Sequence, residues 1–530
     1  MSLHLKIISL SLLLTLTSCA NLQQNIQQNK EMVIGCGLGA GIGALVGNKL
    51  GGKRGAYVGG GLGAFVGCQI GYQYQQRRQA LAKIAQQQAM SIQFSIIETV
   101  KNEKSGKEQF LVVDDSQQKN KHSTSHRTGK DQPKKTQNTI GLSASIANAD
   151  GKPLYLAGSV LPTSQSEAKI KQLAQAFKGS DKNILIIGHT DSSGDPEQNQ
   201  QLSERRAQYI SKLFAQSGIP VQRLYFQGAG ATQPRSTNQT AQGRAKNRRI
   251  EVVEIDGRPD KLMDYANHQQ AEMKYLALRS QDKVMAMNTQ KLTSTSSTYQ
   301  GGRSNRNNSA QQPSKVQDLN PQNHFPKVNT VKPKVDFAGK PMKKMTSDFY
   351  ARIGLKADKG FSLFKHAYAD EALGLNCAIE GRNLTGKVKN LKTGQIFDRN
   401  HYKTSEFLPG LFGTVWSQKM NGHYVALSPV AVLENNGESV SNPKLKIWTH
   451  YSQSKTRAKA DYDVDTEVET YYGDKGLLYR VFPVSSQAPF RCIDLLLPIE
   501  NSTQAIDGVL FYDKNHKINQ TTFAPSLLTH

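Results

Sequence analysis

The chain has 530 residues, of which 37% are apolar and 7% aromatic, and it carries 67 lysines and arginines against 42 acids. This length excludes a single hydrophobic core, because chains longer than about 250–300 residues divide into domains. The formal net charge of +25 at pH 7 favours polyanionic surroundings, such as nucleic acid, anionic lipid headgroups or cell-wall polymers, and does not choose among them.

Residues 1–18 predict export. A short basic start and an almost unbroken apolar run, too short to span a bilayer, end at Leu16-Thr17-Ser18-Cys19. This ending resembles a bacterial lipobox, which implies that residues 1–18 are a lipoprotein signal peptide and that Cys19 carries the lipid. Ala20 in place of an aspartate implies, by the same resemblance, attachment to the outer membrane on its periplasmic side. The alternative is an ordinary secretory signal with an incidental cysteine.

Residues 32–71 carry a glycine at every fourth position, from Gly35 to Gly71. This spacing lines one face of a helix with glycine, so that a second helix can approach closely. The pattern of Gly39–Gly47 recurs in Gly59–Gly67, and the polar segment between the copies predicts a hairpin of two helices. The segment resembles the glycine zipper of some envelope lipoproteins, which implies membrane insertion or self-association. A packed periplasmic hairpin is the alternative.

The cysteines other than Cys19 predict up to two disulfides, because an exported chain meets an oxidising environment. The turn of the glycine-rich hairpin places Cys36 opposite Cys68, so we expect a disulfide between them. Cys377 and Cys492 are the second candidate pair, but the sequence does not fix the distance between them.

Between the hairpin and the next folded region, residues 73–90 predict a glutamine-rich helix. Residues 92–100 and 109–113 then predict two strands around a tight turn. Residues 116–139 contain six lysines and arginines and no apolar residue, which indicates a solvated loop or tether.

Residues 152–256 alternate strand and helix patterns. Asp195 is a good helix cap and Pro196 suits the first helical turn, while Gly218 marks the end of that helix. The expected elements are a weak first strand at 154–161, a helix at 166–177, a strand at 183–187, a helix ending near 216, and strands at 223–227 and 249–255. This order predicts an α/β sandwich with helices on one face of a small sheet.

Four motifs in this region resemble the OmpA-like C-terminal domain, a family that binds peptidoglycan non-covalently. They are GHTDxxG from Gly188, NxxLSxxRA from Asn199, GxGxxxP from Gly228 and GRxxNRR from Gly243. Each motif is weak alone, but the four in this order and at this spacing are a specific signal. Two features depart from the family pattern: the first strand lacks alternating aromatic residues, and Ala231 stands where an acid is common.

The resemblance implies a site for the diaminopimelate of the peptidoglycan stem peptide, whose free centre carries an ammonium and a carboxylate. By resemblance, Asp191 accepts the ammonium and Arg206 binds the carboxylate with its planar fork. Asn199 is expected to orient the loop or to contact the peptide, Leu202 to shape the pocket wall, and Thr190 to belong to the same site. The alternative is that Asp191 and Arg206 form a structural ion pair.

A basic cluster accompanies these motifs. It consists of Arg205, Arg244, Lys246, Arg248 and Arg249. The cluster is interpreted either as a contact for acidic wall groups or as a solvated face with one buried arginine. No Ser or Cys nucleophile with an ordered partner is visible near His189, and the chain has no HExxH motif, Cys/His cluster or phosphate loop. We therefore expect no catalytic residues, no metal and no cofactor.

Residues 257–345 predict a basic low-complexity linker. Residues 261–292 have a helical composition, whereas 294–333 are rich in Ser, Asn, Gln and Pro and predict a flexible tether. Aromatic residues are sparse among the basic ones, so nucleic-acid binding is not expected.

Residues 346–530 predict a mainly-β domain of no recognised family, with Trp416 and Trp448 in its core. Its expected strands are 424–427, 444–450, 467–472, 477–484, 492–498 and 508–512.

The predicted architecture is multidomain: a glycine-rich helical hairpin, a central α/β OmpA-like sandwich, a flexible basic linker and a mainly-β C-terminal domain. The predicted function is that of an outer-membrane lipoprotein without enzymatic activity that links the outer membrane to the cell wall. Its expected partners are peptidoglycan, membrane lipid through Cys19 and a second copy through the glycine zipper. The alternatives are a wall-anchored part of a secretion or conjugation apparatus and a wall-modifying enzyme with its activity in 346–530.

Overall fold

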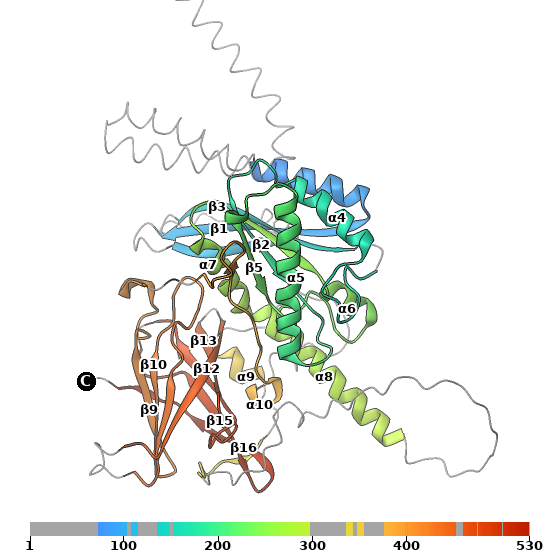
Figure 1. The fold of residues 1–530 in the computed structure, drawn as a ribbon. Helices are drawn as coiled ribbons and strands as arrows, with labels where there is room; N and C mark the ends of the chain where they lie inside the picture. The colour runs from blue at the N-terminus through green and yellow to red at the C-terminus, as the bar shows by residue number, and fades with distance from the viewer. Residues whose placement is uncertain are drawn as a thin grey trace, which may run out of the picture.

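The fold comprises two modules, each built around one β-sheet (Figure 1). The N-terminal module contains the described residues up to 296, and the C-terminal module contains those from 335 onward, although the short strand β8 (Lys389–Asn390) of the latter extends the sheet of the N-terminal module. The computed structural model describes residues 73–102, 108–114, 135–148, 152–296, 335–342, 347–353, 376–397, 399, 401–451, 459–473, 475–500 and 502–528. The predicted signal peptide, Cys19, the glycine-rich hairpin, Cys36 and Cys68 lie outside these residues.

The sheet of the N-terminal module has seven strands in the order β2-β1-β3-β6-β4-β5-β8. Neighbouring strands are antiparallel except β4 and β5, which are parallel. The strands are β1 (Met90–Asn102), β2 (Glu108–Asp114), β3 (Lys135–Asn148), β4 (Asn183–Gly188), β5 (Leu224–Gly228), β6 (Ile250–Ile255) and β8 (Lys389–Asn390). The predicted strand pair is confirmed by β1 and β2, whereas the turn predicted between them lies outside the described residues.

Helices cover both faces of this sheet. The helices of the module are a helix over 73–87, α4 (Ser164–Gln175), α5 (Pro196–Gln216), α6 (Ala241–Asn247), α7 (Asp260–Gln270) and α8 (Met273–Ser296), with a short 3-10 turn, η1 (Val221–Arg223). Figure 1 shows α4 and α5 side by side in front of the strands. The helices predicted before β4 and after Asp195 are confirmed, and the Asp195 side chain accepts a hydrogen bond from the Gln198 amide, as a helix cap should.

Strand β4 shows why the sheet needs cover on both sides. Ile184 and Ile186 pack on the α4–α5 side with Phe214, whereas Leu185 packs on the opposite side with Tyr265 of α7. All four β4 side chains that alternate between these faces are fully buried. The prediction of helices on one face is therefore correct for α4 and α5 but incomplete, because α7 covers the second face.

The predicted first strand at 154–161 is wrong. Tyr155 forms only an isolated bridge with Pro162, and Gly158 turns the chain with a φ of +71°. The strand that occupies this place beside β6 is β3, whose first residues fall within the predicted loop at 116–139. β3 alternates apolar and small polar residues, and its Leu142, Ala144 and Ile146 are buried.

The beginning of the predicted linker is folded. Helix α7 buries Leu262 and Tyr265 against the sheet, and Leu276 of α8 lies in the core of the C-terminal module. The expected helical character of 261–292 is confirmed as two helices. The expectation that a linker begins at residue 257 is wrong, because α7 and the first part of α8 bury apolar side chains in the cores of the modules. Residues 297–334 lie outside the described part of the chain.

The C-terminal module is mainly β, as predicted. Its ten-stranded sheet has the order β17-β9-β10-β11-β12-β13-β14-β15-β16-β7, with antiparallel neighbours throughout. The strands are β7 (Lys340–Pro341), β9 (Thr414–Met420), β10 (His423–Val430), β11 (Lys444–Trp448), β12 (Tyr462–Tyr472), β13 (Gly476–Pro483), β14 (Cys492–Pro498), β15 (Asp507–Lys514), β16 (Lys517–Phe523) and β17 (Ser526–Leu527). Short helical segments are α9 (Ser347–Ala351), α10 (Cys377–Glu380) and η3 (Thr404–Glu406).

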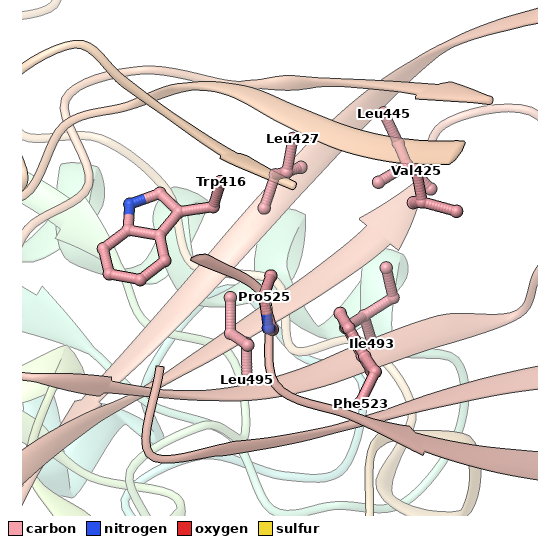
Figure 2. A pocket seen from close by; sticks show the side chains of 8 residues that line it. All are labelled: Trp416, Val425, Leu427, Leu445, Ile493, Leu495, Phe523 and Pro525. Atoms are coloured by element: carbon pink, nitrogen blue, oxygen red, sulfur yellow. The ribbon is translucent and has the colours of Figure 1, made fainter. Parts of the chain in front are cut away.

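The main core of this module lies between β9–β11 and β13–β15. Trp416 is 1% exposed and packs with Leu427 and Leu495, which confirms its predicted place in the core. Trp448 is only half-buried and its ring lies 5.8 Å from that of Tyr424, so its predicted place in the core is wrong. A hollow in this core, shown in Figure 2, is lined by apolar side chains, and the one indole N–H among them, that of Trp416, already donates to the Thr414 hydroxyl.

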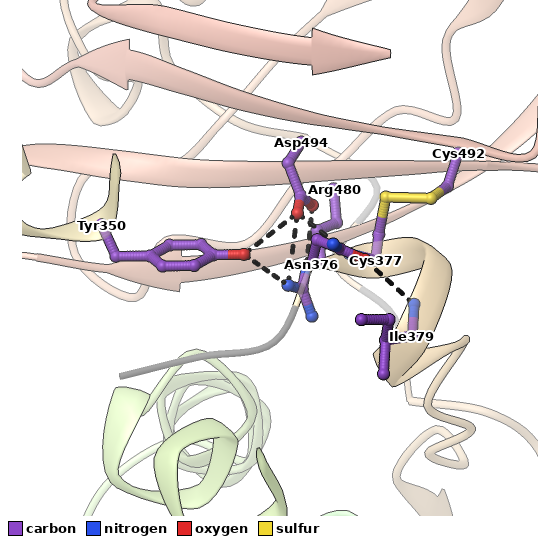
Figure 3. Close-up of a disulfide and its surroundings, with 7 residues drawn as sticks. All are labelled: Tyr350, Asn376, Cys377, Ile379, Arg480, Cys492 and Asp494. Carbon is purple, nitrogen blue, oxygen red and sulfur yellow. Dashed lines mark hydrogen bonds and ion pairs between the residues drawn. A yellow bond between two sulfur atoms is a disulfide. The ribbon is translucent and has the colours of Figure 1, made fainter. Parts of the chain in front are cut away.

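A disulfide joins Cys377 to Cys492 and confirms the second predicted pair. It ties α10 to β14 beside a buried ion pair between Arg480 and Asp494, which Figure 3 shows together with Tyr350. The Asp494 carboxylate also accepts hydrogen bonds from the Tyr350 hydroxyl and the Cys377 amide.

The C-terminal module is fastened to the edge of the N-terminal sheet. β8 pairs antiparallel with β5, and the Gly386 amide donates a 2.8 Å hydrogen bond to the Gly228 carbonyl. The Lys389 ammonium lies 2.6 Å from the Glu204 carboxylate of α5. Strand β5 is thus an inner strand of the sheet rather than an exposed edge.

Candidate functional site

The loop after β4 holds Asp191 at the beginning of α5. The Ser193 amide donates a 2.9 Å hydrogen bond to one oxygen of the Asp191 carboxylate, and the Arg248 guanidinium lies 2.5 Å from the other. The Asp191 side chain is 10% exposed and that of Arg248 is 15% exposed. The carboxylate predicted to bind an ammonium is therefore accessible at its edge and already neutralised by a cation.

Arg206 lies deeper than Asp191, on the inner face of α5. It is 1% exposed and donates hydrogen bonds to the carbonyls of Ser159 at 2.8 Å and Leu156 at 3.3 Å. Its guanidinium also lies 4.3 Å from the centre of the Tyr155 ring. The turn that replaces the predicted first strand thus covers this arginine.

Burial lowers the pKa of Arg206 to about 10, while Tyr155 and then Asp191 act to raise it. The guanidinium is therefore a cation at neutral pH and feels the Asp191 carboxylate electrostatically. The structure brings Asp191 and Arg206 into one region without a direct ion pair among the described contacts. The direct partner of Asp191 is Arg248, which sequence analysis placed only in the basic cluster.

Two of the remaining predicted site residues, Asn199 and Thr190, hold the loop in place. The Asn199 side-chain amide donates a 2.8 Å hydrogen bond to the Ser193 carbonyl, which agrees with its expected role in orienting the loop. The Thr190 amide donates to the Gly230 carbonyl at 2.9 Å, and its side chain is buried. Leu202 is half-buried on α5.

Two glycines allow α5 to lie close to the ends of β4 and β5. A Cβ at Gly188 would lie 2.1 Å from the Ser203 carbonyl oxygen, and one at Gly228 would lie 2.4 Å from the Glu204 amide nitrogen. Ser203 uses this proximity to accept a 2.8 Å hydrogen bond from the Gly230 amide. The glycines of the first and third motifs are thus required by close backbone packing next to the site.

The basic cluster divides into residues with different roles. Arg249 is buried and donates to Ser145 at 3.2 Å and to the Gln233 carbonyl at 2.9 Å, so it is the one structural arginine that the second interpretation expected. Arg205 is exposed. Arg244 donates to the Asn238 carbonyl at 2.9 Å, which leaves Arg248 as the member that contacts the site carboxylate.

The GRxxNRR motif also supplies the support of the site loop. The Asn247 side chain accepts hydrogen bonds from the amides of Arg235 and Ser236 and donates to Asn238 at 2.9 Å. Asn238 in turn accepts a 3.1 Å hydrogen bond from the Ser192 amide, next to Asp191. Sequence analysis missed Asn238, although its place between the third and fourth motifs was a usable signal.

Comparison with known proteins places these residues in a family. The sequence model of the OmpA family matches residues 157–248, and that of the YMGG-like Gly-zipper matches residues 1–75. Outer membrane protein A of Bordetella avium is 39% identical over 90 residues, which cover 17% of this chain and 46% of that protein. Outer-membrane lipoprotein YfiB of Pseudomonas aeruginosa is 35% identical over 89 residues, covering 17% of this chain and 53% of that protein. Putative lipoprotein YfiB of Escherichia coli is 39% identical over 116 residues, covering 22% of this chain and 69% of that protein. The chain belongs to the OmpA family.

The OmpA-family match confirms the first predicted resemblance, and the YMGG-like Gly-zipper match confirms the second. The chain spans about half the length of the first two relatives. The matched range contains Asp191, Arg206 and Arg248, whereas α7, α8 and the C-terminal module lie beyond it.

The described part of this OmpA-family chain carries neither a metal-binding cluster nor a membrane-spanning helix. Among the described residues, no group of three or more His, Cys, Asp or Glu side chains is placed to hold a metal ion. None of the helices that the structure describes is long and apolar enough to cross a bilayer.

The OmpA-family core contains one histidine whose titration predicts a pH effect. Burial lowers the pKa of His189 to about 3, and the Arg249 guanidinium lowers it too, against the opposing effect of Glu251. Between about pH 3 and pH 6.5, this histidine is therefore protonated in the unfolded chain and neutral in the folded chain. The stability that neutral His189 contributes is thus complete above about pH 6.5 and is lost as the pH falls towards 3.

We expect His189→Asn to remove this loss. The difference in the free energy of unfolding between the natural protein and the variant should shrink by roughly 1.4 kcal/mol for each pH unit below about pH 6. Thermal unfolding of both proteins, followed by circular dichroism between pH 7.5 and 4.5, measures the difference. Asp264, whose pKa burial raises to about 6, titrates in the same range with the opposite sign but is common to both proteins. An advantage that stays constant with pH would contradict the prediction.

Proposed function

We propose that this chain binds peptidoglycan non-covalently, at a site formed by Asp191, Arg206 and Arg248. The observation that carries the proposal is an acid held between a loop amide and one guanidinium, with a second guanidinium just beneath it. The Asp191 loop of the site leads into the beginning of α5, where the positive end of the helix dipole favours a carboxylate, whereas Arg206 lies in the middle of the helix.

The proposed ligand is the free amino-acid centre of diaminopimelate in the stem peptide. Its ammonium competes with Arg248 for the Asp191 carboxylate, and the Arg248 guanidinium that is released turns to the ligand carboxylate. Each charge then keeps a partner, which matters because a desolvated charge without one is costly. Arg206 adds a fixed positive charge behind the site, and its rigid hydrogen bonds to the 156–159 turn hold it in place.

The rest of the chain supports a role at the outer membrane. Two OmpA-family relatives are named lipoproteins, one of them an outer-membrane lipoprotein. The present chain adds a signal-like start that ends at Cys19 and a matched glycine zipper. We propose that lipid on Cys19 attaches the protein to the outer membrane, that the zipper contributes self-association, and that the wall site connects this membrane to the cell wall.

A sacculus pull-down with the full mature chain tests the proposal. Asp191→Asn keeps the shape of the side chain and removes its charge, and Arg206→Lys keeps the charge and removes the planar fork. We expect each variant to bind purified sacculi at least about tenfold more weakly. Asp191→Asn loses the charged partner of the ligand ammonium, and Arg206→Lys loses the forked hydrogen bonds that hold the 156–159 turn and the charge behind the site in place. Thermal melting confirms that each variant is folded.

Two exposed neighbours provide the controls. Arg205→Ala removes an exposed arginine adjacent to Arg206, and Asp181→Asn neutralises an exposed acid just before β4. Both should bind sacculi like the natural protein. Soluble muropeptide that contains diaminopimelate should compete with the sacculi. Natural binding by both Asp191→Asn and Arg206→Lys would refute the proposed site.

A further inference from the structure

The Asp191 loop depends on Asn238 for its position. The Asn238 side-chain oxygen accepts hydrogen bonds from the Ser192 amide at 3.1 Å and from Asn247 at 2.9 Å. Asn238 is itself buried on a stretch without regular secondary structure, between β5 and α6. Its position therefore has to be fixed by a further contact.

That contact comes from α8, beyond the residues matched to the OmpA family. The Asp282 carboxylate accepts a 2.8 Å hydrogen bond from the Asn238 amide, a 3.2 Å bond from its side chain and a 2.5 Å bond from the Thr237 hydroxyl. Gln239 donates a 2.8 Å hydrogen bond to the Asp282 carbonyl. One buried carboxylate thus accepts three of the hydrogen bonds that hold residues 237–238.

The same helix is bound by the C-terminal module. The Arg279 guanidinium donates to Glu380 at 3.1 Å and to the Tyr471 hydroxyl at 3.0 Å. Lys283 donates to the Glu380 carbonyl. Arg279 also donates to the Thr232 carbonyl of the N-terminal module. Both modules therefore bind helix α8 within the five residues from Arg279 to Lys283.

We propose that Asp282 is a positioning residue for the wall site, and that the docked C-terminal module holds the α8 turn from which it acts. A chain of contacts runs from Glu380 through Arg279 and Lys283 to α8, and from Asp282 through Asn238 to the Ser192 amide. The proposal rests on the proposed function, because it concerns the affinity of that same site.

The direct test is Asp282→Asn in the full mature chain. The substitution removes the negative charge and replaces one of the two acceptor oxygens by an NH2 donor, so the hydrogen bonds to Asn238 become weaker neutral bonds and the Thr237 hydroxyl loses the oxygen to which it donates. We expect sacculus binding about tenfold weaker than that of the natural protein, and a shifted Ser192 amide signal in NMR spectra of serine-labelled protein. Gln281→Ala, an exposed neighbour on the same helix, should change neither.

A double-mutant cycle with Asn238→Ala separates positioning from a general loss of stability. If Asp282 acts through Asn238, then Asp282→Asn weakens binding little further in the Asn238→Ala background. The proposal would be overturned if the double variant lost affinity for sacculi by the full product of the two single losses. It would also be overturned if Asp282→Asn kept the affinity of the natural protein and an unchanged Ser192 amide signal. If the natural chain itself does not bind sacculi, the proposed function fails and the inference fails with it. Binding by the natural chain that Asp282→Asn leaves intact makes the inference fail alone.

Discussion

Asp494→Ala is expected to lower the free energy of unfolding of the C-terminal module by about 3–5 kcal/mol, because it leaves a buried guanidinium without its carboxylate. Arg480 and Asp494 are both 0% exposed and lie 2.8 Å apart. The substitution also removes the acceptor of the Tyr350 hydroxyl and the Cys377 amide. The measurement is urea denaturation followed by tryptophan fluorescence, which reports on this module because both tryptophans of the chain, Trp416 and Trp448, lie in it.

The matched control is a second arginine–aspartate pair in the same module. Arg491 and Asp513 also lie 2.8 Å apart, but their side chains are 24% and 23% exposed. Asp513→Ala should therefore lower the free energy of unfolding by no more than about 1 kcal/mol. Equal losses for Asp494→Ala and Asp513→Ala would contradict the argument from burial.

Cys377→Ser is expected to lower the free energy of unfolding of the same module by about 2–5 kcal/mol. The disulfide with Cys492 closes a loop with a sequence separation of 115 residues, and opening it restores that conformational freedom to the unfolded chain. Tryptophan fluorescence again follows the unfolding.

Reducing agent supplies the control for the disulfide. It should destabilise the natural protein by a similar amount and leave the tryptophan transition of Cys377→Ser unchanged, because that variant has no bond left to reduce in this module. A natural protein whose tryptophan transition does not respond to reduction would refute the prediction.

Local patterns were sufficient to predict much of the fold. Asp195 and Pro196 mark the beginning of α5, and Cys492–Pro498 was predicted with the bounds that the structure has for β14. These elements have strong signals within a few residues: a cap with a proline, or an uninterrupted apolar run. Strand β16 was missed because its sequence is polar at most positions, as an outer strand with one covered face allows.

Tertiary contacts explain what the sequence did not predict. The stretch at 154–161 has apolar residues but is bent into a turn, because its carbonyls accept hydrogen bonds from Arg206. Helix α7 was placed in a linker because its composition is polar, yet Leu262 and Tyr265 are enough to bind it to the sheet. Both outcomes depend on residues that are distant along the chain.

The site was predicted in part for the same reason. The motifs gave Asp191, Arg206 and the supporting Asn199, since these residues lie on one strand end and one helix. The consecutive Arg248 and Arg249 are chemically identical in sequence, and only the fold shows that Arg248 reaches Asp191 while Arg249 is buried. Asp282 lies on a helix outside the matched region, so no local pattern connects it to the site.

The pairing of β8 with β5 has a consequence for biosynthesis. During synthesis, β5 emerges long before Lys389 and Asn390, so its backbone amides and carbonyls on that side have no strand to pair with in the meantime. Unpaired strand edges promote aggregation. We therefore expect chains truncated before residue 389 to be more prone to aggregate than the complete chain, and chaperones that bind extended segments to engage the nascent chain at this stage.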